Sequence, residues 1–516
     1  MSEQLALLPD RLTAHLQLTL LALLISTAVS LPLGILVTRV RWLEQPALAI
    51  AGIIQTVPSL ALLAMMVPVL AALELQSIGF LPAIIGLTLY GVLPILRNTV
   101  TGIAGVDPAL KEAARGVGMT PSQQLRQVEL PLAMPVIVAG IRTSTVWIVG
   151  IATLSTPVGA TSLGNYIFAG LQTRNYTAVL VGCVAAALLA LLLDGLVRAL
   201  EDGVRTRQRR RVTIALAVLA VLYGYTGFSF ASTHLLRGDA PITIGAKTFT
   251  EQYILSAMLG QWVEQETGRP TAVMQSLGSI VAFDALSAED IDIYIDYSGT
   301  LWANEMGRDT VPTDRADVLR DVTEFLQEVH NIRLVSTLGF ENSYALATRE
   351  QDAEALGLRR ISDLTLHAPR LSIGSDYEFF ARPEWASIRD TYGLRFASQR
   401  SMDSTLMYQA VAQGTVDVIS AFSTDGRIAA YDLRVLDDDR GAIPPYDAVV
   451  LVSGRMTRAF PDVIDALERL DGTIDADEMR RMNLAVDEQG MNPSEVAERF
   501  LRELVARGER APAPAP

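Results

Sequence analysis

The chain has 516 residues, of which 50% are hydrophobic and 19% are charged, and its mean hydropathy is +0.31. This length is too great for one ordinary domain, and such an apolar composition excludes a wholly soluble protein. The formal net charge of −14 argues against a nucleic-acid partner, because nucleic-acid phosphates attract basic surfaces.

Long apolar blocks fill the chain up to about residue 231. A membrane-spanning helix needs about 20 mostly apolar residues. The second block contains Pro58, a residue type that interrupts helices, so the ends of that span are the hardest to assign. The sequence predicts an all-α polytopic membrane domain over residues 1–231 with about six spans, at 14–38, 46–72, 79–96, 132–155, 177–199 and 212–231.

Lysine and arginine residues gather on alternate loops of this domain. Arg39 and Arg41 follow the first span, a second group lies between the third and fourth spans, and five arginines at 205–211 follow the fifth. Loops rich in Lys and Arg stay in the cytoplasm. We therefore expect an inner-membrane, multi-pass protein with its N-terminus outside. Six crossings then place everything from residue 242 outside the cytoplasm, after a tether at 232–241.

From residue 242 the sequence is typical of a soluble α/β domain. A strand at 242–245 leads into a helix from about Thr250, and amphipathic helices then alternate with short apolar strands. This alternation predicts an α/β fold with largely parallel sheets, long enough over 242–508 for two lobes with a cleft between them. Residues 509–516 are expected to form a disordered tail, because Ala and Pro alternate there.

The loop between the third and fourth spans, about 98–131, has an unusual pattern. Residues 108–118 favour a short helix, Gly118 breaks it, and a Leu-Pro pair ends a second piece before the next span. An ordinary cytoplasmic helical loop is the alternative interpretation. The pattern resembles the coupling (EAA) loop of ABC importer permeases, which docks on the ATPase. This resemblance implies ATPase-coupling roles for Glu112, Ala113, Ala114, Gly118, Leu130 and Pro131.

Other blocks resemble the branch of these importers that serves glycine betaine, carnitine, choline and related osmoprotectants. In the membrane half they lie at 55–62, 139–143 and 159–164; in the soluble half they lie at 244–252, 291–300, 340–344, 421–426, 436–439 and 444–447. The chain is identified as a fused permease and substrate-binding protein. The resemblance implies a type I permease fold, followed by a two-lobed periplasmic-binding-protein fold. Its lobes are expected at about 242–340 with 450–505, and at about 341–449.

The family's ligand chemistry implies a set of binding residues. A quaternary ammonium group cannot donate an N–H hydrogen bond, so its recognition relies on aromatic faces, and a betaine carboxylate needs a cationic or hydroxyl clamp. Phe422 departs from the usual tyrosine, and Asn342 stands where some relatives carry Asp. By resemblance the cage is Tyr297, Tyr344, Phe422 and Tyr446, with Asn342 beside it, and the clamp is Lys247, Thr300 and Arg382.

Convergence of the clamp residues would indicate a zwitterion such as glycine betaine and not a plain cation such as choline. Carnitine, choline and ergothioneine-like betaines stay open as ligands. Each tyrosine taken alone could instead be a core or rim residue, and Lys247 a solvated surface lysine.

The chain lacks the Gly-x-x-x-x-Gly-Lys-Ser/Thr loop of nucleotide-binding proteins. We therefore expect a transporter subunit that is not an enzyme, holds no cofactor and works with a separate ABC ATPase. One coupling loop per chain predicts a homodimer in the lipid membrane. A membrane-tethered receptor is the alternative, although the coupling loop would then be idle. Cys183 is the one cysteine, so we expect no disulfide. The histidines lack metal-ligand spacing: His15, His234, His330 and His367.

Overall fold

The computed structural model describes residues 6–73, 75–173, 175–234, 241–308 and 314–507. Most of the expected tether and the whole expected tail at 509–516 lie outside these ranges. The chain divides into two compact units. One is the helical membrane unit and the other carries the α/β fold, and each is described by itself.

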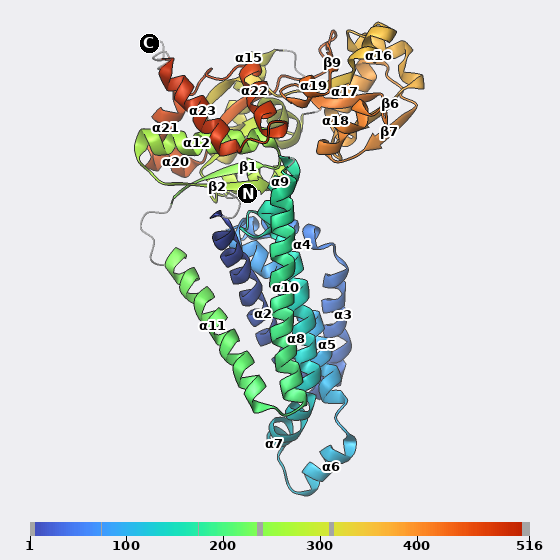
Figure 1. Cartoon of the computed structure of the whole chain (residues 1–516), viewed down its shortest axis with the longest axis vertical. Coiled ribbons are helices and arrows are strands. Elements are labelled where there is room, and N and C mark those ends of the chain that lie inside the picture. Colours follow the sequence, from blue (N-terminus) through green and yellow to red (C-terminus); the bar gives the residue numbers. More distant parts are fainter. Residues whose placement is uncertain (1–5, 74, 174, 235–240, 309–313, 508–516) are drawn as a thin grey trace. The chain divides into compact units, whose positions relative to one another are not determined.

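The membrane unit is helical throughout (Figure 1). Five of its helical segments are long and apolar enough to cross a membrane, and a sharply bent pair could supply a sixth span. Its main helices are α2 (Leu8–Arg39), α3 (Arg41–Thr56), α4 (Ser59–Ala72), α5 (Phe80–Ala104), α8 (Leu130–Ala152), α10 (Tyr176–Arg205) and α11 (Arg209–His234).

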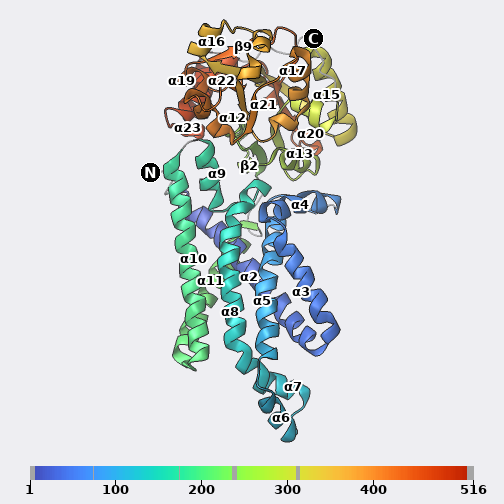
Figure 2. The same ribbon diagram turned by 90° about the vertical axis from the view of Figure 1, so that its right-hand side faces the viewer.

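The second predicted span, 46–72, is not one helix. It is the pair α3 and α4, bent by 101°, and Figure 2 shows α4 lying across the long direction of α3. Val57 is extended, with ψ 130°. Proline disfavours the α conformation of the residue before it and has no N–H for the helix. Pro58 therefore separates the two helices.

Helices α2, α5 and α8 form the packed centre of this unit. Gly91 of α5 sits where a Cβ would lie 2.5 Å from Ser26 Oγ and 2.9 Å from Ser144 Oγ. Ser144 Oγ donates to the Gly91 carbonyl at 3.0 Å. Close approach at small residues, with hydroxyls bonded to backbone carbonyls, is how membrane helices pack.

The α/β unit contains two five-stranded sheets. The first has the order β2-β1-β3-β10-β4 and the second the order β7-β6-β8-β5-β9. The strands of the first sheet are β1 (Ile242–Lys247), β2 (Thr271–Leu277), β3 (Ile293–Tyr297), β4 (Arg333–Glu341) and β10 (Asp447–Val452). Those of the second are β5 (Tyr344–Arg349), β6 (Ser372–Ser375), β7 (Ser398–Ser401), β8 (Val418–Phe422) and β9 (Leu433–Leu436).

The sheets are mixed, and the expectation of largely parallel sheets is wrong. β10 runs antiparallel to both β3 and β4, and β5 runs antiparallel to β8 and β9. The chain leaves the first sheet after β4 and returns to it as β10. Neighbouring strands of a βαβ unit are parallel because a helical crossover joins them. Such a crossover does not set the direction of β10, because β10 returns from the second sheet.

Helices cover the first sheet. α12 (Thr250–Thr267) packs on β1 and contacts α21 (Pro461–Glu468), α22 (Ala476–Asp487) and α23 (Pro493–Ala506). Its buried apolar residues join a continuous hydrophobic core with strands of both sheets. In α12 these core residues include Ile254, Met258 and Leu259. This packing fixes the strand ends where the candidate site residues lie.

Candidate functional site

Tyr344 is the centre of an aromatic group, which we name the Tyr344 cluster: Tyr344, Phe379, Phe422 and Tyr446. Tyr344 opens β5 and lies directly opposite Phe422, the last residue of β8. Its ring centroid is 4.8 Å from that of Phe379, 5.2 Å from Phe422 and 6.4 Å from Tyr446. The structure therefore brings together three of the four predicted cage residues and adds Phe379.

Arg382 provides a positive charge beside this cluster. Its guanidinium carbon lies 5.5 Å from the Tyr344 ring centroid, within cation–π range. It also pairs with Glu378 at 3.1 Å and with Glu384 at 3.4 Å. Burial opposes the charge of Arg382, but Tyr344 and the two carboxylates leave its pKa raised. Glu384 is buried and accepts a hydrogen bond from the Tyr446 hydroxyl.

Tyr297 belongs to a second group at the end of β3. Its ring centroid is 6.2 Å from that of Phe249, and its hydroxyl donates to Glu251 Oε1 at 2.5 Å. Asn342 joins the two groups. Its amide side chain donates to Glu251 Oε1 at 2.9 Å, and its backbone N–H donates to the Tyr446 carbonyl at 3.0 Å.

Lys247 is buried at the end of β1, so it is not a solvated surface lysine. Its Nζ lies 2.6 Å from Asp296 Oδ1 and 5.9 Å from the Tyr297 ring centroid. Thr300 is half-buried in α14 (Ser298–Thr300), the turn that follows Tyr297. Lys247 thus lies at the end of a strand of the first sheet and Thr300 in the turn after another, whereas Arg382 lies beside the Tyr344 cluster. The charge of Lys247 is already matched by a buried carboxylate.

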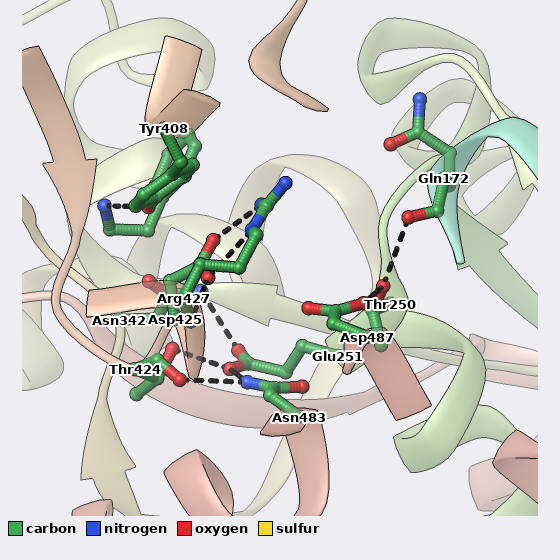
Figure 3. Close-up of polar contacts among 11 residues, drawn as sticks. Gln172, Thr250, Glu251, Asn342, Tyr408, Thr424, Asp425, Arg427, Asn483 and Asp487 are labelled. Atoms are coloured by element: carbon green, nitrogen blue, oxygen red, sulfur yellow. Dashed lines mark hydrogen bonds and ion pairs between the residues drawn. The ribbon is translucent and has the colours of Figure 1, made fainter. Parts of the chain in front are cut away.

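Glu251 is a functional candidate that sequence reasoning missed. It lies buried in the first turn of α12. Besides Tyr297 and Asn342, it accepts hydrogen bonds on Oε2 from Thr424 Oγ1 at 2.6 Å and from Asn483 Nδ2 at 3.1 Å (Figure 3). Burial raises the pKa of Glu251, and these hydrogen bonds oppose that shift. The carboxylate therefore links residues that follow strands of both sheets to α22.

A second buried polar group lies beside Glu251 (Figure 3). Arg427 makes a bidentate pair with Asp425, at 2.8 and 2.5 Å, and its guanidinium carbon lies 4.2 Å from the Tyr408 ring centroid. On α22, Asp487 accepts from Thr250 Oγ1 at 2.6 Å. Burial raises the pKa of Asp487 to about 7, although the charge of Arg427 acts to lower it.

The predicted coupling helix is α6 (Pro108–Gly116). Asp107 caps it by accepting from the Ala109 N–H at 2.8 Å, and proline occupies the first helical position, where its missing N–H costs nothing. Glu112 and Ala113 are exposed and Ala114 is buried. Gly118 follows with φ +81°, a conformation that favours glycine.

The expectation that Leu130 and Pro131 end a helix is wrong. The second piece runs through α7 (Pro121–Gln124) and a π-helical turn, η1 (Leu125–Glu129), directly into α8. In this turn the Leu130 N–H bonds to the Leu125 carbonyl five residues earlier. The wider turn precedes Pro131, which lacks an N–H and sits in the first turn of α8, so proline is tolerated without a break.

The site shows no arrangement for metal chemistry. Within the described ranges, no group of three or more His, Cys, Asp or Glu residues is placed to hold a metal ion. The chemistry that the described side chains offer is aromatic contact, ion pairing and hydrogen bonding.

Each half of the chain matches a known protein family. Residues 30–206 match the family described as the inner membrane component of binding-protein-dependent transport systems. Residues 240–503 match the substrate-binding domain of the ABC-type glycine betaine transport system.

Several curated proteins are similar to this chain. An ergothioneine transport permease/ergothioneine binding protein of Helicobacter pylori (strain G27) is 30% identical over 89% of this chain and 83% of its own length. A choline transport system permease of Bacillus subtilis (strain 168) is 46% identical over 35% of this chain and 80% of its own. A carnitine transport binding protein of Listeria monocytogenes serotype 1/2a (strain 10403S) is 30% identical over 56% and 96%.

The two family matches together cover the membrane unit and the α/β unit of this polypeptide. The proteins of these families are transporter components and not enzymes. In these systems a separate subunit carries the ATPase activity. The chain therefore belongs to the betaine-type ABC importer family, as a fused inner-membrane permease and substrate-binding protein.

Proposed function

We propose that this chain captures a zwitterionic quaternary ammonium compound resembling glycine betaine and passes it through a permease dimer driven by a separate ATPase. The observation that carries the proposal is the Tyr344 cluster with Arg382 beside it. Aromatic faces attract a trimethylammonium group, and a guanidinium can clamp a carboxylate. The two halves of a betaine need these two kinds of partner. No cofactor has a role in the proposal.

Ligand entry requires a rearrangement of the cluster. The centroids of Tyr344 and Phe422 are 5.2 Å apart, so the rings contact each other and leave no room for a trimethylammonium group between them. The guanidinium of Arg382 already faces Tyr344. We infer that the ligand cation takes this place on the ring while Arg382 turns to the ligand carboxylate.

Tyr297, Lys247, Thr300 and Asn342 are proposed as the opposite wall of the site, on the first sheet. The Asn342 backbone bond to Tyr446 supports their proximity to the cluster. A ligand carboxylate near Lys247 would compete with Asp296 for its ammonium group. We therefore propose that Arg382 is the stronger of the two cationic clamps.

An ergothioneine-like betaine is a second candidate ligand. The Helicobacter pylori relative, which matches this chain across both halves, is named for ergothioneine. Such a ligand keeps the trimethylammonium and carboxylate groups, so the same cluster and clamp would serve it.

Titration calorimetry of the full chain in lipid nanodiscs, with glycine betaine, ergothioneine, carnitine and choline, tests the ligand. The proposal predicts tighter binding of the zwitterions than of choline. Tight binding of choline with no binding of any zwitterion contradicts it. A parallel readout is the fluorescence of Trp385, whose ring centroid lies 5.5 Å from that of Phe379. A ligand-induced change that disappears in Trp385→Phe would report movement of the cluster.

Orientation and coupling complete the proposal. The alternate loops rich in Lys and Arg support an outside N-terminus, six crossings and an extracytoplasmic binding domain. The exposed residues of α6, with Gly118 after it, support docking of the ATPase there, and one coupling segment per chain supports a homodimer. A C-terminal reporter that works only in the cytoplasm should be inactive, and native mass spectrometry should find two copies of this chain. An active reporter contradicts the orientation, and a transport-competent complex with a single copy contradicts the dimer.

A further inference from the structure

Glu129 is a buried carboxylate in the coupling segment. It closes the π-helical turn η1, and its side chain is only 1% exposed. Placing a carboxylate out of water is costly unless it is paired and hydrogen-bonded. Both oxygens of Glu129 have donors: Gln124 Nε2 donates to Oε1 at 2.8 Å, and Arg39 reaches both oxygens.

Arg39 is the last residue of α2, the first membrane helix. Its Nη2 lies 2.5 Å from Glu129 Oε2 and its Nη1 lies 3.4 Å from Oε1. The planar guanidinium fork meets the carboxylate at two points, which fixes direction as well as distance. The contact therefore ties the end of α2 to the coupling segment ninety residues later in the chain.

The coupling segment is also held at its other end. Lys111 of α6 donates to the Ile103 carbonyl of α5 at 2.9 Å. Thus α6 is held to α5 and η1 is held to α2. The exposed surface of the coupling segment between these two contacts is available to the ATPase. A displacement of this surface would pull on two different membrane helices, and α2 packs along both α5 and α8.

The π-helical turn makes Glu129 a sensitive point. π turns are closed by hydrogen bonds between residues five apart, are rare, and occur frequently at functional sites. Such turns are among the few places where a helix bends sharply. In this chain the turn lies between the coupling helices and α8, with the ion pair at its last residue.

We propose that the Arg39–Glu129 ion pair is the positioning contact that transmits movement of the coupling segment to α2. This inference rests on the proposed docking of an ATPase at residues 108–131, and it names the residues that receive the movement. Arg39 and Glu129 act through the helices and touch neither ligand nor nucleotide.

The test uses the full chain, copurified with its ATPase and reconstituted in proteoliposomes, with glycine betaine as the probe. Glu129→Gln keeps the size of the side chain and an acceptor for Gln124 but removes the charge that pairs with Arg39. The ATPase should still copurify in the wild-type ratio and the glycine betaine Kd should stay unchanged. Stimulation of ATP hydrolysis by glycine betaine should disappear, and uptake should fall at least tenfold. Arg39→Gln should behave alike, and the double variant should be no worse than either single variant.

Asp194→Asn is the matched control. It breaks another bidentate pair, Arg142–Asp194, at 2.6 and 3.0 Å, which joins α8 to α10 outside the coupling segment. Its ratio of ATP hydrolysed to ligand transported should stay near the wild-type value.

Three results overturn the inference: stimulated hydrolysis and uptake that persist in Glu129→Gln, loss of the ATPase from that complex, or equal uncoupling by Asp194→Asn. If the wild-type complex shows no ATP-dependent uptake, the proposed function fails by itself, before any variant is compared.

Discussion

Replacing Arg382 by glutamine should separate zwitterionic ligands from plain cations. Arg382 lies against Tyr344 and between two carboxylates. A hydrogen bond to a charged group contributes about 1.5–3 kcal/mol. At about 1.4 kcal/mol per factor of ten, a betaine should bind roughly 10- to 150-fold more weakly once the clamp is lost.

Choline should respond differently, because it has no carboxylate to lose. Removing Arg382 also takes away a like charge and leaves the Tyr344 face free, while Glu378 and Glu384 stay in place beside it. Choline binding should therefore stay the same or become tighter.

Calorimetric titration of the full chain in nanodiscs with glycine betaine and choline measures both effects. Arg389→Gln is a suitable control, because Arg389 lies on α17 (Pro383–Tyr392) and pairs with the exposed Asp390 at 2.7 Å. Equal losses of betaine and choline affinity in Arg382→Gln would refute the clamp assignment. Unchanged betaine affinity would refute it as well.

Further substitutions test the aromatic cage, two buried ionisable residues and the turn after the coupling helix. Tyr344→Leu should weaken betaine and choline alike, by about 0.5–2 kcal/mol or roughly 2- to 30-fold in Kd, and calorimetry showing that only one ligand is affected would be inconsistent with a cage. Lys247→Met should lower the unfolding free energy by about 3–5 kcal/mol, because it leaves Asp296 buried without its cation; adding Asp296→Asn should restore part of this loss in denaturant unfolding. Asp487 has a folded pKa of about 7 against an ordinary 3.8, so the stability it contributes is complete below about pH 4 and is lost as the pH rises to about 7. The slope is at most about 1.4 kcal/mol per pH unit, and melting curves of Asp487→Asn should lack this component; identical pH profiles would count against it. Gly118→Trp should abolish uptake in vesicles while ligand binding persists, and normal uptake would count against docking at that turn.

Much of the fold could be predicted from the sequence because its signals are local. Apolar length identified the membrane helices, the predicted strand at 242–245 lies within β1, and the helix predicted from about Thr250 is α12. The direction of β10 could not be predicted, because it depends on how the chain returns from the second sheet. The continuity of η1 with α8 depends on a π-helical turn, for which a Leu-Pro pair carries no distinct sequence signal.

The sequence predicted the aromatic residues of the candidate site but not the carboxylates that contact them. Tyr344, Phe422 and Tyr446 lie in distinctive motifs, and the structure groups them. Glu251 also lies in one of those motifs, but its partners Thr424 and Asn483 follow 173 and 232 residues later. The ion pair between Lys247 and Asp296 could not be predicted from the sequence either, because contacts between strand ends depend on tertiary packing.

We propose above that this chain and a separate ATPase import a quaternary ammonium zwitterion. The most direct measurement is uptake of radiolabelled glycine betaine by proteoliposomes that contain the copurified complex, with ATP on the side of the coupling segment. We expect accumulation that requires ATP and that falls sharply in Arg382→Gln. Binding of glycine betaine without ATP-dependent accumulation by a complex that hydrolyses ATP would contradict it.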